Sequence, residues 1–433
     1  MRPTFLIWLC LFLSTFAKAE SVSLKALLSE ALTEAPSIQK SQSAFEEARW
    51  KKVESLQGFL PRLDGSINYL TNKKYMLLDI NLGGNPATIA QVIPTTIYTL
   101  TASLPLFDGM ASTNRYWAGQ SMQKSAQHDL DWARFSTQQQ ITLYFYKTLA
   151  AQALKDVAEQ NLKTLNDHLK DAQALKKAGI ATSYDVLRVD VQVSEAKSEV
   201  LNTRDNFDLS KMKLAEVLGK ESEARDLDGK LPVLPAQVLA QVKTLHIENR
   251  ADLQSLKEKV DSLHDLDTAA SRFWSPKLSA FGQYQYYNNI NDNFSDNEKF
   301  REAYQVGVSL TWNFLDGVGL AKSRQAAAQA QQLDTTLTQA RLKARQDFEF
   351  WKRKLNYFKT VYESKVVDVE KSSEAIRLAK EGRKAGTRTT TELLDAELEL
   401  FRSRASQVNS QIGVIESLIN LELATGQQIY EFN

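Results

Sequence analysis

The sequence predicts a mainly α-helical protein with a smaller set of strands typical of a membrane β-barrel, built from two copies of one unit. Three observations lead to this fold class. Two stretches of more than 60 residues contain no proline, four short segments alternate apolar and polar residues, and motifs from the first half return in the second half at a nearly constant spacing. Each observation is weak alone, and together they favour long helices joined to short strands.

The composition excludes several classes of function. The 433 residues include 53 Lys+Arg and 52 Asp+Glu, a net charge of +1, so the chain lacks the basic surface typical of nucleic-acid-binding proteins. Four His and one Cys provide little material for a metal site or a disulfide framework. We therefore expect no cofactor, no metal and no nucleic-acid partner.

The amino terminus has the pattern of a secretory signal peptide. Arg2 precedes an apolar run at residues 5–13, and Ala17-Lys18-Ala19 follows it as a small-x-small cleavage site. We expect residues 1–19 to be removed and the mature chain to be exported. No other segment reaches the ~18 consecutive apolar residues of a membrane-spanning helix.

The chain repeats itself. Gly386 lies 207 residues after Gly179 within matching Lys-Ala-Gly turns, and Asp316 lies 208 residues after Asp108 within matching Asp-Gly pairs. The sequence therefore predicts two repeats of about 200 residues each, at 20–225 and 226–433. The first copy is longer between its Pro-Arg-Leu and Asp-Gly motifs, so an exposed loop is expected over residues 71–94.

Long helices are predicted in both copies. At 1.5 Å per residue, the two long proline-free stretches would each form a helix of roughly 95–100 Å, several times the usual length. Val186, Val193 and Val200 begin a seven-residue apolar repeat, which indicates coiled-coil packing. An amphipathic helix on a globular core is the alternative for one copy alone. The helices are expected over about 22–58, 113–177, 182–218, 236–274, 321–384 and 389–425.

The remaining segments alternate with the period of a strand. Strands are expected over about 61–71, 95–107, 276–287 and 304–313, each with one apolar face and one polar face. Surface hairpins are the alternative interpretation. Four strands cannot close a membrane barrel, because known barrels begin at about eight strands and lipid tolerates no unpaired edge. Three chains would supply twelve strands to one shared barrel, together with a trimeric cylinder of helices.

In the order and spacing of its motifs, nearly the whole mature chain resembles the TolC-like outer-membrane efflux proteins. The resemblance rests on the twofold repeat, the two strand-end Asp-Gly motifs, the two glycine turns and the terminal glycine patterns. It implies a homotrimer in the outer membrane, in contact with lipid and extending into the periplasm. It also implies a passive exit duct of a tripartite efflux or type I secretion system, which docks on a periplasmic adaptor and an inner-membrane transporter.

The resemblance also implies a gate at the periplasmic helix tips. Asp185 matches the first tip, and Arg388, Glu392 and Asp395 match the second. Arg388 and Asp185 would form a charge pair between tips, whereas Glu392 and Asp395 would form acidic rings around the axis. The turn residues would contact the adaptor: Gly179, Ile180, Ala181, Gly386 and Thr387.

A simpler role competes for two of the gate residues. Asp185 and Glu392 each lie three residues after a threonine, in the pattern of a capping box. The sequence leaves capping and gating open for both. Asp395 lies beyond the cap, so it is the first candidate for a pore-lining acid, with a solvated outer face as its alternative.

Other functions are less well supported by the residues. The main alternative is a periplasmic coiled-coil adaptor, which also has a signal peptide and helical hairpins but usually only one hairpin. No catalytic arrangement is visible, so the chain is expected not to be an enzyme. The four His, including His168 and His264, are expected at solvated helix positions. The transported substrate is not predicted.

Overall fold

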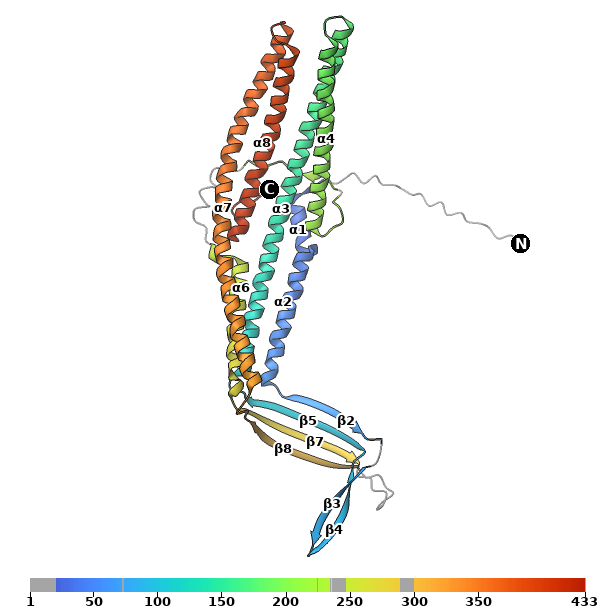
Figure 1. Ribbon diagram of the computed structural model, residues 1–433, viewed down its shortest axis with the longest axis vertical. Coiled ribbons are helices and arrows are strands. Elements are labelled where there is room, and N and C mark those ends of the chain that lie inside the picture. Colours follow the sequence, from blue (N-terminus) through green and yellow to red (C-terminus); the bar gives the residue numbers. More distant parts are fainter. Residues whose placement is uncertain are drawn as a thin grey trace, which may run out of the picture. The chain divides into compact units, whose positions relative to one another are not determined.

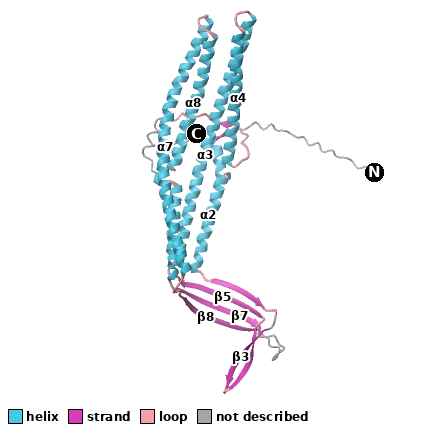
Figure 2. Ribbon diagram, viewed as in Figure 1, coloured by secondary structure: helices cyan, strands magenta, loops and turns pink. Residues whose placement is uncertain are grey.

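The computed structural model describes residues 21–71, 74–223, 225–233, 235, 247–288 and 300–432. The expected signal peptide lies outside these residues. Most of the described chain is helical, with strands making up much of the rest (Figure 2), which confirms the predicted fold class. The longer helices, shown in Figure 1, are α1 (Leu24–Glu34), α2 (Pro36–Ser55), α3 (Ala111–Lys177), α4 (Ser183–Leu218), α6 (Ala251–Ser271), α7 (Gly317–Lys384) and α8 (Thr390–Thr425).

The strands form three separate sheets among the described residues. A parallel pair joins two short strands, an antiparallel hairpin stands alone, and a four-stranded sheet contains the expected strands. The strands are β1 (Val22–Ser23), β2 (Arg62–Tyr69), β3 (Lys74–Leu82), β4 (Asn85–Ile93), β5 (Thr96–Phe107), β6 (Leu227–Asp228), β7 (Lys277–Asn288) and β8 (Phe300–Thr311).

The chain divides into two compact units. The first comprises Met1–Ser41, Leu130–Ala251 and Leu342–Asn433, and the second comprises Gln42–Asp129 and Asp252–Arg341. The first unit holds α4, α8 and most of α3 and α7, whereas the second holds the four-stranded sheet and most of α6. Each sequence repeat therefore contributes to both units.

Two apolar clusters contribute to the core of the first unit. In one, Leu394 of α8 packs with Leu165 of α3 and Val193 of α4. In the other, Leu355 of α7 packs with Val414, Leu418 and Leu421 of α8. Val193, Val414 and Leu421 belong to the seven-residue repeats, so these periodic positions pack between helices as expected of a coiled coil.

The four-stranded sheet in the second unit is antiparallel, in the order β2-β5-β7-β8. Its register places polar residues of neighbouring strands together on one face and most of the apolar residues on the other. On the polar face Gln283 donates to Thr101 at 3.4 Å and Gln305 donates to Gln283 at 2.5 Å. On the other face Tyr286 stacks on Phe300, with ring centroids 5.0 Å apart.

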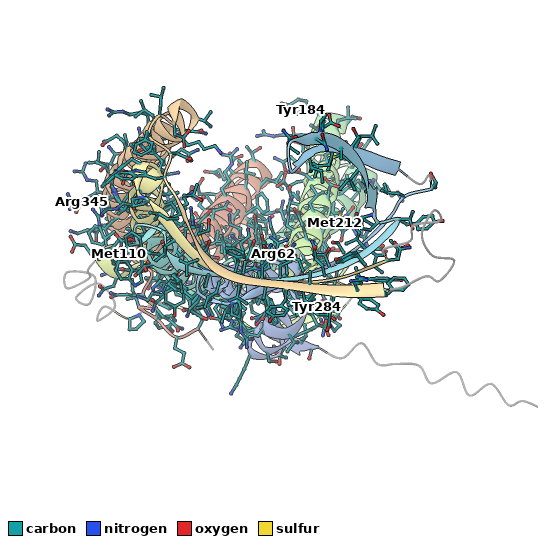
Figure 3. All side chains as sticks on the ribbon, turned by 90° about the horizontal axis from the view of Figure 1, so that it is seen from below. Arg62, Met110, Tyr184, Met212, Tyr284 and Arg345 are labelled. Atoms are coloured by element: carbon teal, nitrogen blue, oxygen red, sulfur yellow. The ribbon has the colours of Figure 1, made fainter. Side chains whose placement is uncertain are left out.

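The apolar face is exposed in the single chain. Val306, Val308 and Leu310 on β8 are all solvent-exposed, in alternation along the strand. Arg62 on the polar face and Tyr284 on the apolar face are labelled in Figure 3. A sheet with one exposed apolar face and two outer strands, β2 and β8, has polar backbone groups still to be satisfied at both edges.

The structure corrects the expected loop over residues 71–94. This interval contains the hairpin of β3 and β4, which pair from Lys74↔Ile93 to Leu82↔Asn85. Gly83 and Gly84 form its two-residue turn with φ values of 59° and 94°, as a tight hairpin turn requires. The insertion is therefore an ordered extension with β-structure.

The structure also corrects the first expected helix, over residues 22–58. Ala35 is extended, with φ −61° and ψ 124°, and separates α1 from α2. The residue before a proline is disfavoured in helical geometry, so Pro36 ends one helix and begins the next. Part of the expected helix over 236–274 lies outside the described residues, and its remainder contains α6. None of the described helices is both long and apolar enough to span a membrane.

Candidate gate at the helix tips

The two glycine turns have the same geometry, although 207 residues separate them. Gly179 and Gly386 adopt left-handed conformations with φ values of 76° and 75°, which a side chain would disfavour. The next amide in each turn donates back to the last turn of the preceding helix, Ile180 N to Leu175 O and Thr387 N to Gly382 O, both at 2.9 Å. Each tip therefore reverses the chain between a long helix and the start of the following helix.

Asp185 and Glu392 both close capping boxes. Asp185 accepts from the backbone amide of Thr182 at 2.8 Å, and Glu392 accepts from that of Thr389 at 2.8 Å. Each threonine hydroxyl accepts in return from the backbone amide of the acid at 3.2 Å. The capping role left open by the sequence is thus present for both acids, and it stabilises the start of α4 and of α8.

The caps also keep both acids ionised. The hydrogen bond from the Thr182 side chain lowers the pKa of Asp185, and its backbone amide lowers it further. For Glu392, the largest cause of the lowered pKa is the backbone amide of Thr389, followed by Arg388. Both carboxylates are therefore charged at neutral pH, and this adds negative charge at each helix N-terminus.

Arg388 has its partner on its own helix. Its Nη1 lies 2.8 Å from Glu392 Oε1, in an exposed pair one helical turn apart. Asp185 is bound to Thr182 instead of to Arg388. Within one chain the structure therefore does not bring Arg388 and Asp185 together, and an Arg388–Asp185 pair between tips stays a prediction.

One contact between the two hairpins near their tips is made by a residue that the sequence did not single out. Arg188 of α4 donates to Thr391 Oγ1 at 3.0 Å, and its Nη2 lies 4.0 Å from Asp395 Oδ1. Leu394, between these two residues in the sequence, is buried against α3 and α4. Asp395 therefore faces the first hairpin beside an apolar contact.

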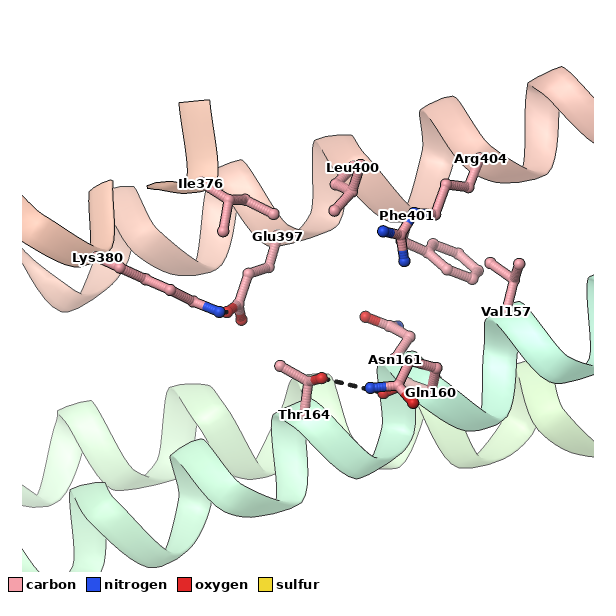
Figure 4. A pocket seen from close by; sticks show the side chains of 10 residues that line it. All are labelled: Val157, Gln160, Asn161, Thr164, Ile376, Lys380, Glu397, Leu400, Phe401 and Arg404. Atoms are coloured by element: carbon pink, nitrogen blue, oxygen red, sulfur yellow. Dashed lines mark hydrogen bonds and ion pairs between the residues drawn. The ribbon is translucent and has the colours of Figure 1, made fainter. Parts of the chain in front are cut away.

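A second polar contact between the hairpins lies further from the tips. Glu397 of α8 is only 6% exposed, and His168 of α3 has its Nε2 2.7 Å from Glu397 Oε2. The two groups are not oriented for a hydrogen bond, so the contact is an ion pair when His168 is protonated. Lys380 of α7 lies 3.7 Å from the other carboxylate oxygen, and Figure 4 shows its amino group beside Glu397.

This contact corrects the expectation of a solvated position for His168, whereas His246 lies outside the described residues. The side chain of His168 is 13% exposed because it lies between α3 and α8. His264 agrees better with the expectation, since it is half exposed and lies 3.0 Å from Asp334 on the surface of the second unit. No group of three or more His, Cys, Asp or Glu side chains in the described ranges is placed to hold a metal ion.

The repeat itself contains a signal for the missed arginine. Adding the 207-residue offset to position 188 gives 395, so Arg188 and Asp395 are equivalent positions of the two copies. Opposite charges at equivalent positions near the two helix tips suggest a contact between the two repeats of the chain. Glu397 gave a weaker signal, because its equivalent Asp190 is also an acid and the two positions show no difference in charge.

The expected adaptor-contact residues lie at the outer end of each tip. Ile180 is 74% exposed and Gly179, Gly386 and Thr387 are also exposed, whereas Ala181 is half-buried. An exposed isoleucine in a turn is an unusual use of an apolar side chain. The first tip therefore presents an exposed apolar side chain, whereas the equivalent position at the second tip is Thr387.

Comparisons with known proteins agree with this architecture. Residues 27–220 and 244–427 match the sequence model of the family described as Outer membrane efflux protein. The proteases secretion protein PrtF of Dickeya chrysanthemi is 23% identical over 347 residues, covering 76% of this chain and 72% of PrtF. The outer membrane protein TolC of Vibrio cholerae serotype O1 is 24% identical over 318 residues, covering 70% of this chain and 71% of TolC.

A solved structure shows the same fold. The outer membrane protein VceC from Vibrio cholerae matches with a TM-score of 0.77 at 16% identity, over 94% of this chain and 97% of VceC. The family match, together with this fold, shows an outer-membrane channel protein and not a periplasmic adaptor. The chain belongs to the outer membrane efflux protein family, as its motifs predicted.

Proposed function

We propose that three copies of this chain form one exit duct for efflux or type I secretion, with a shared barrel and a helical tunnel. The observation that carries the proposal is the open sheet. It has four strands, one exposed apolar face and two outer strands, and three such sheets would give twelve strands in a closed ring. Closure would satisfy the edges of β2 and β8 and leave the apolar face toward lipid.

An apolar stripe on α4 supports the oligomer. Tyr184, Leu187 and Val191 are spaced three and four residues apart, and each is at least 58% exposed. Residues with this spacing share one helix face. A neighbouring copy would cover this face and continue the ring of helices, as in a cyclic homotrimer.

The partners follow from the family and from the tips. We assign the exposed tip turns to a periplasmic adaptor, which would connect the duct to an inner-membrane transporter. The relative named for protease secretion supports a secretion system, and the family description supports efflux. The chain would be a passive conduit and not an enzyme, since its tip residues are engaged in caps and ion pairs instead of a catalytic arrangement.

The gate would be held closed within each chain by the contacts between its hairpins. Arg188 binds Thr391 and approaches Asp395, while Leu394 is buried beside them. Moving the α7–α8 tip away from α3 and α4 would break these contacts together. Glu392 would supply charge at the entrance in addition to its capping role, and Asp395 would become free to face the pore.

The gate is tested by replacing Arg188 with alanine. The exposed charge contact contributes at most about 1 kcal/mol per chain, so the open-to-closed ratio is expected to rise up to about fivefold for each chain that opens. Single-channel recording in planar bilayers measures this ratio. Arg204→Ala, which removes an exposed arginine from the same helix, is the control and should leave the conductance unchanged.

Arg388→Ala distinguishes the two possible gate contacts. Since Arg388 binds Glu392 on its own helix, this variant should change the conductance less than Arg188→Ala. Opening by Arg388→Ala and by Asp185→Ala, but not by Arg188→Ala, would instead favour a charge pair between neighbouring tips. Absence of channels in every preparation, including the wild type, would contradict the duct itself.

A further inference from the structure

A basic cavity lies in the second unit, where the sheet meets the ends of the helices. It has a volume of about 730 Å³ and is lined by strand residues from β5, β7 and β8 and by helical residues from α3, α6 and α7. Four cationic side chains line it, against two carboxylates. The cations are Arg115, Arg272, Lys277 and Lys322, and the carboxylates are Asp108 and Asp316.

Most of the strand residues that line the cavity lie on the polar face of the sheet. Lys277 and Ser279 lie on the same face as Gln283, whereas Leu278 between them lines the cavity from the other face. Lys277 is paired in register with Thr311, another cavity residue, and Ser279 is paired with Pro105. If the apolar face of the sheet meets lipid, this polar face lines the conduit.

Both carboxylates are already engaged at helix starts. Asp108 Oδ2 accepts from the backbone amide of Ser112 at 2.8 Å, and Asp316 Oδ1 accepts from the amide of Gly319 at 2.8 Å. These bonds cap α3 and α7, so the negative charges compensate the helix dipoles. Arg115 lies 3.9 Å from Asp108, at the outer limit of an ion pair.

The other three cations have no carboxylate partner. Among the described residues, no acidic oxygen lies within 4.0 Å of a charged nitrogen of Arg272, Lys277 or Lys322, and Arg272 Nε is buried without a hydrogen-bond partner. The polar face carries further positive charge from Arg301. Arg62 lies on the same face, but its charge is paired with Asp64 at 2.9 Å. Unpaired cations in a concave site attract anions, and the low-dielectric walls strengthen that attraction.

We propose that this cavity is an anion-binding site on the wall of the conduit, which takes carboxylate, phosphate or sulfonate groups of the transported material. The inference rests on the proposed function, since a homotrimer would carry three such sites around one lumen. Each site has more cationic than anionic side chains, and this positive charge favours the binding of polyvalent anions over cations. The site therefore assigns a substrate class to the duct: molecules with several anionic groups. This class does not follow from the tip residues, which include the acids Asp185, Glu392 and Asp395.

The test measures block of the channel by a trivalent anion. Hexacyanocobaltate(III) is added to the barrel side of bilayers holding the full-length trimer, and the concentration for half-block is compared with that of the Arg272→Gln, Lys277→Gln, Lys322→Gln triple variant. We expect the triple variant to need at least about tenfold more anion, and the block to weaken as the salt concentration rises. Hexamminecobalt(III), a trivalent cation, should block less than the anion from this side.

Two further variants keep the result interpretable. Lys277→Gln with Lys322→Gln retains the partly buried Arg272 and should give an intermediate half-block concentration. Lys51→Gln, Lys124→Gln and Lys257→Gln remove three exposed charges outside the cavity and should leave the block unchanged. Equal block of the wild type and the triple variant would overturn the site while leaving the channel intact.

A binding measurement that needs no channel activity tests this proposal separately from the proposed function. If the wild type formed no channels, the duct would fail, and titration calorimetry of the detergent-solubilised protein with hexacyanocobaltate(III) would still test the site. We expect binding by the wild type and a loss of at least about tenfold in affinity in the triple variant. Undetectable binding by the wild type would overturn the site independently of the channel.

Discussion

Glu422→Gln is expected to stabilise the protein at pH 8, by about 2–3 kcal/mol, and to change its stability little at pH 4.5. Glu422 of α8 is fully buried, and burial raises its pKa from 4.5 to about 7. Its Oε1 accepts from the backbone amides of Ile429 and Tyr430 at 2.7 and 2.8 Å, so it holds the C-terminal segment against α8. The amide of glutamine retains this acceptor and cannot ionise.

The sign follows from proton linkage. Because the pKa is higher in the folded state than in the unfolded state, the folded protein retains a proton that the unfolded chain releases above about pH 4.5. The contribution of Glu422 to stability is therefore fully present below pH 4.5 and is lost as pH rises through about 7. The introduced amide would also face Gln139, whose Oε1 is buried without a partner.

Thermal unfolding of the detergent-solubilised protein across this pH range checks the prediction. The difference in midpoint between wild type and Glu422→Gln should grow between pH 5 and pH 8. Glu399→Gln, at an exposed position of the same helix, should show no such trend. A constant difference across the range would mean that Glu422 does not titrate there.

Gly413→Leu is expected to destabilise the first unit by about 3 kcal/mol, because the site has no room for a side chain. A Cβ atom at Gly413 would lie 2.5 Å from the Phe358 ring of α7. Replacing glycine within a helix would otherwise be favourable by roughly 1 kcal/mol, so helix propensity alone predicts the opposite sign. The close approach of α7 and α8 therefore decides the outcome.

Two variants separate packing from other effects. Phe358→Ala with Gly413→Leu should recover part of the lost stability, since the truncated ring makes room for leucine. Gly317→Leu, in the first turn of α7 with open space around its Cβ, should have little effect. Circular dichroism measures the thermal midpoint of helix loss for the wild type, the two single variants and the double variant. Equal loss at Gly413 and Gly317 would contradict the packing explanation.

The sequence predicted those parts of the fold that depend on local pattern. The long helices, the alternating strands and the boxes at Thr182 and Thr389 each result from residues close together in the chain, and the structure contains them. The break at Pro36 was also local, but the expected helix ran through it. The hairpin over 74–93 was missed because the extra length of the first copy was interpreted as a loop, although its Gly83-Gly84 pair is a good hairpin turn.

The candidate site was predicted less completely, because its contacts join residues far apart in the chain. The capping roles of Asp185 and Glu392 could be predicted from their threonines, whereas the partner of Asp395 depends on how α4 packs beside α8. His168 and Glu397 meet for the same reason, and neither lies in a motif. A histidine spacing pattern cannot reveal a buried pair whose members belong to different repeats.

The contact of Arg188 with Asp395 also bears on why the chain has two unequal halves. With two identical repeats, each equivalent position would carry one residue type, arginine beside arginine or aspartate beside aspartate. Joining two halves in one chain lets these positions differ, so the meeting point becomes attractive where strict symmetry would make it repulsive. The divergence of the two repeats thus allows a charge attraction between their hairpins that two identical repeats could not have.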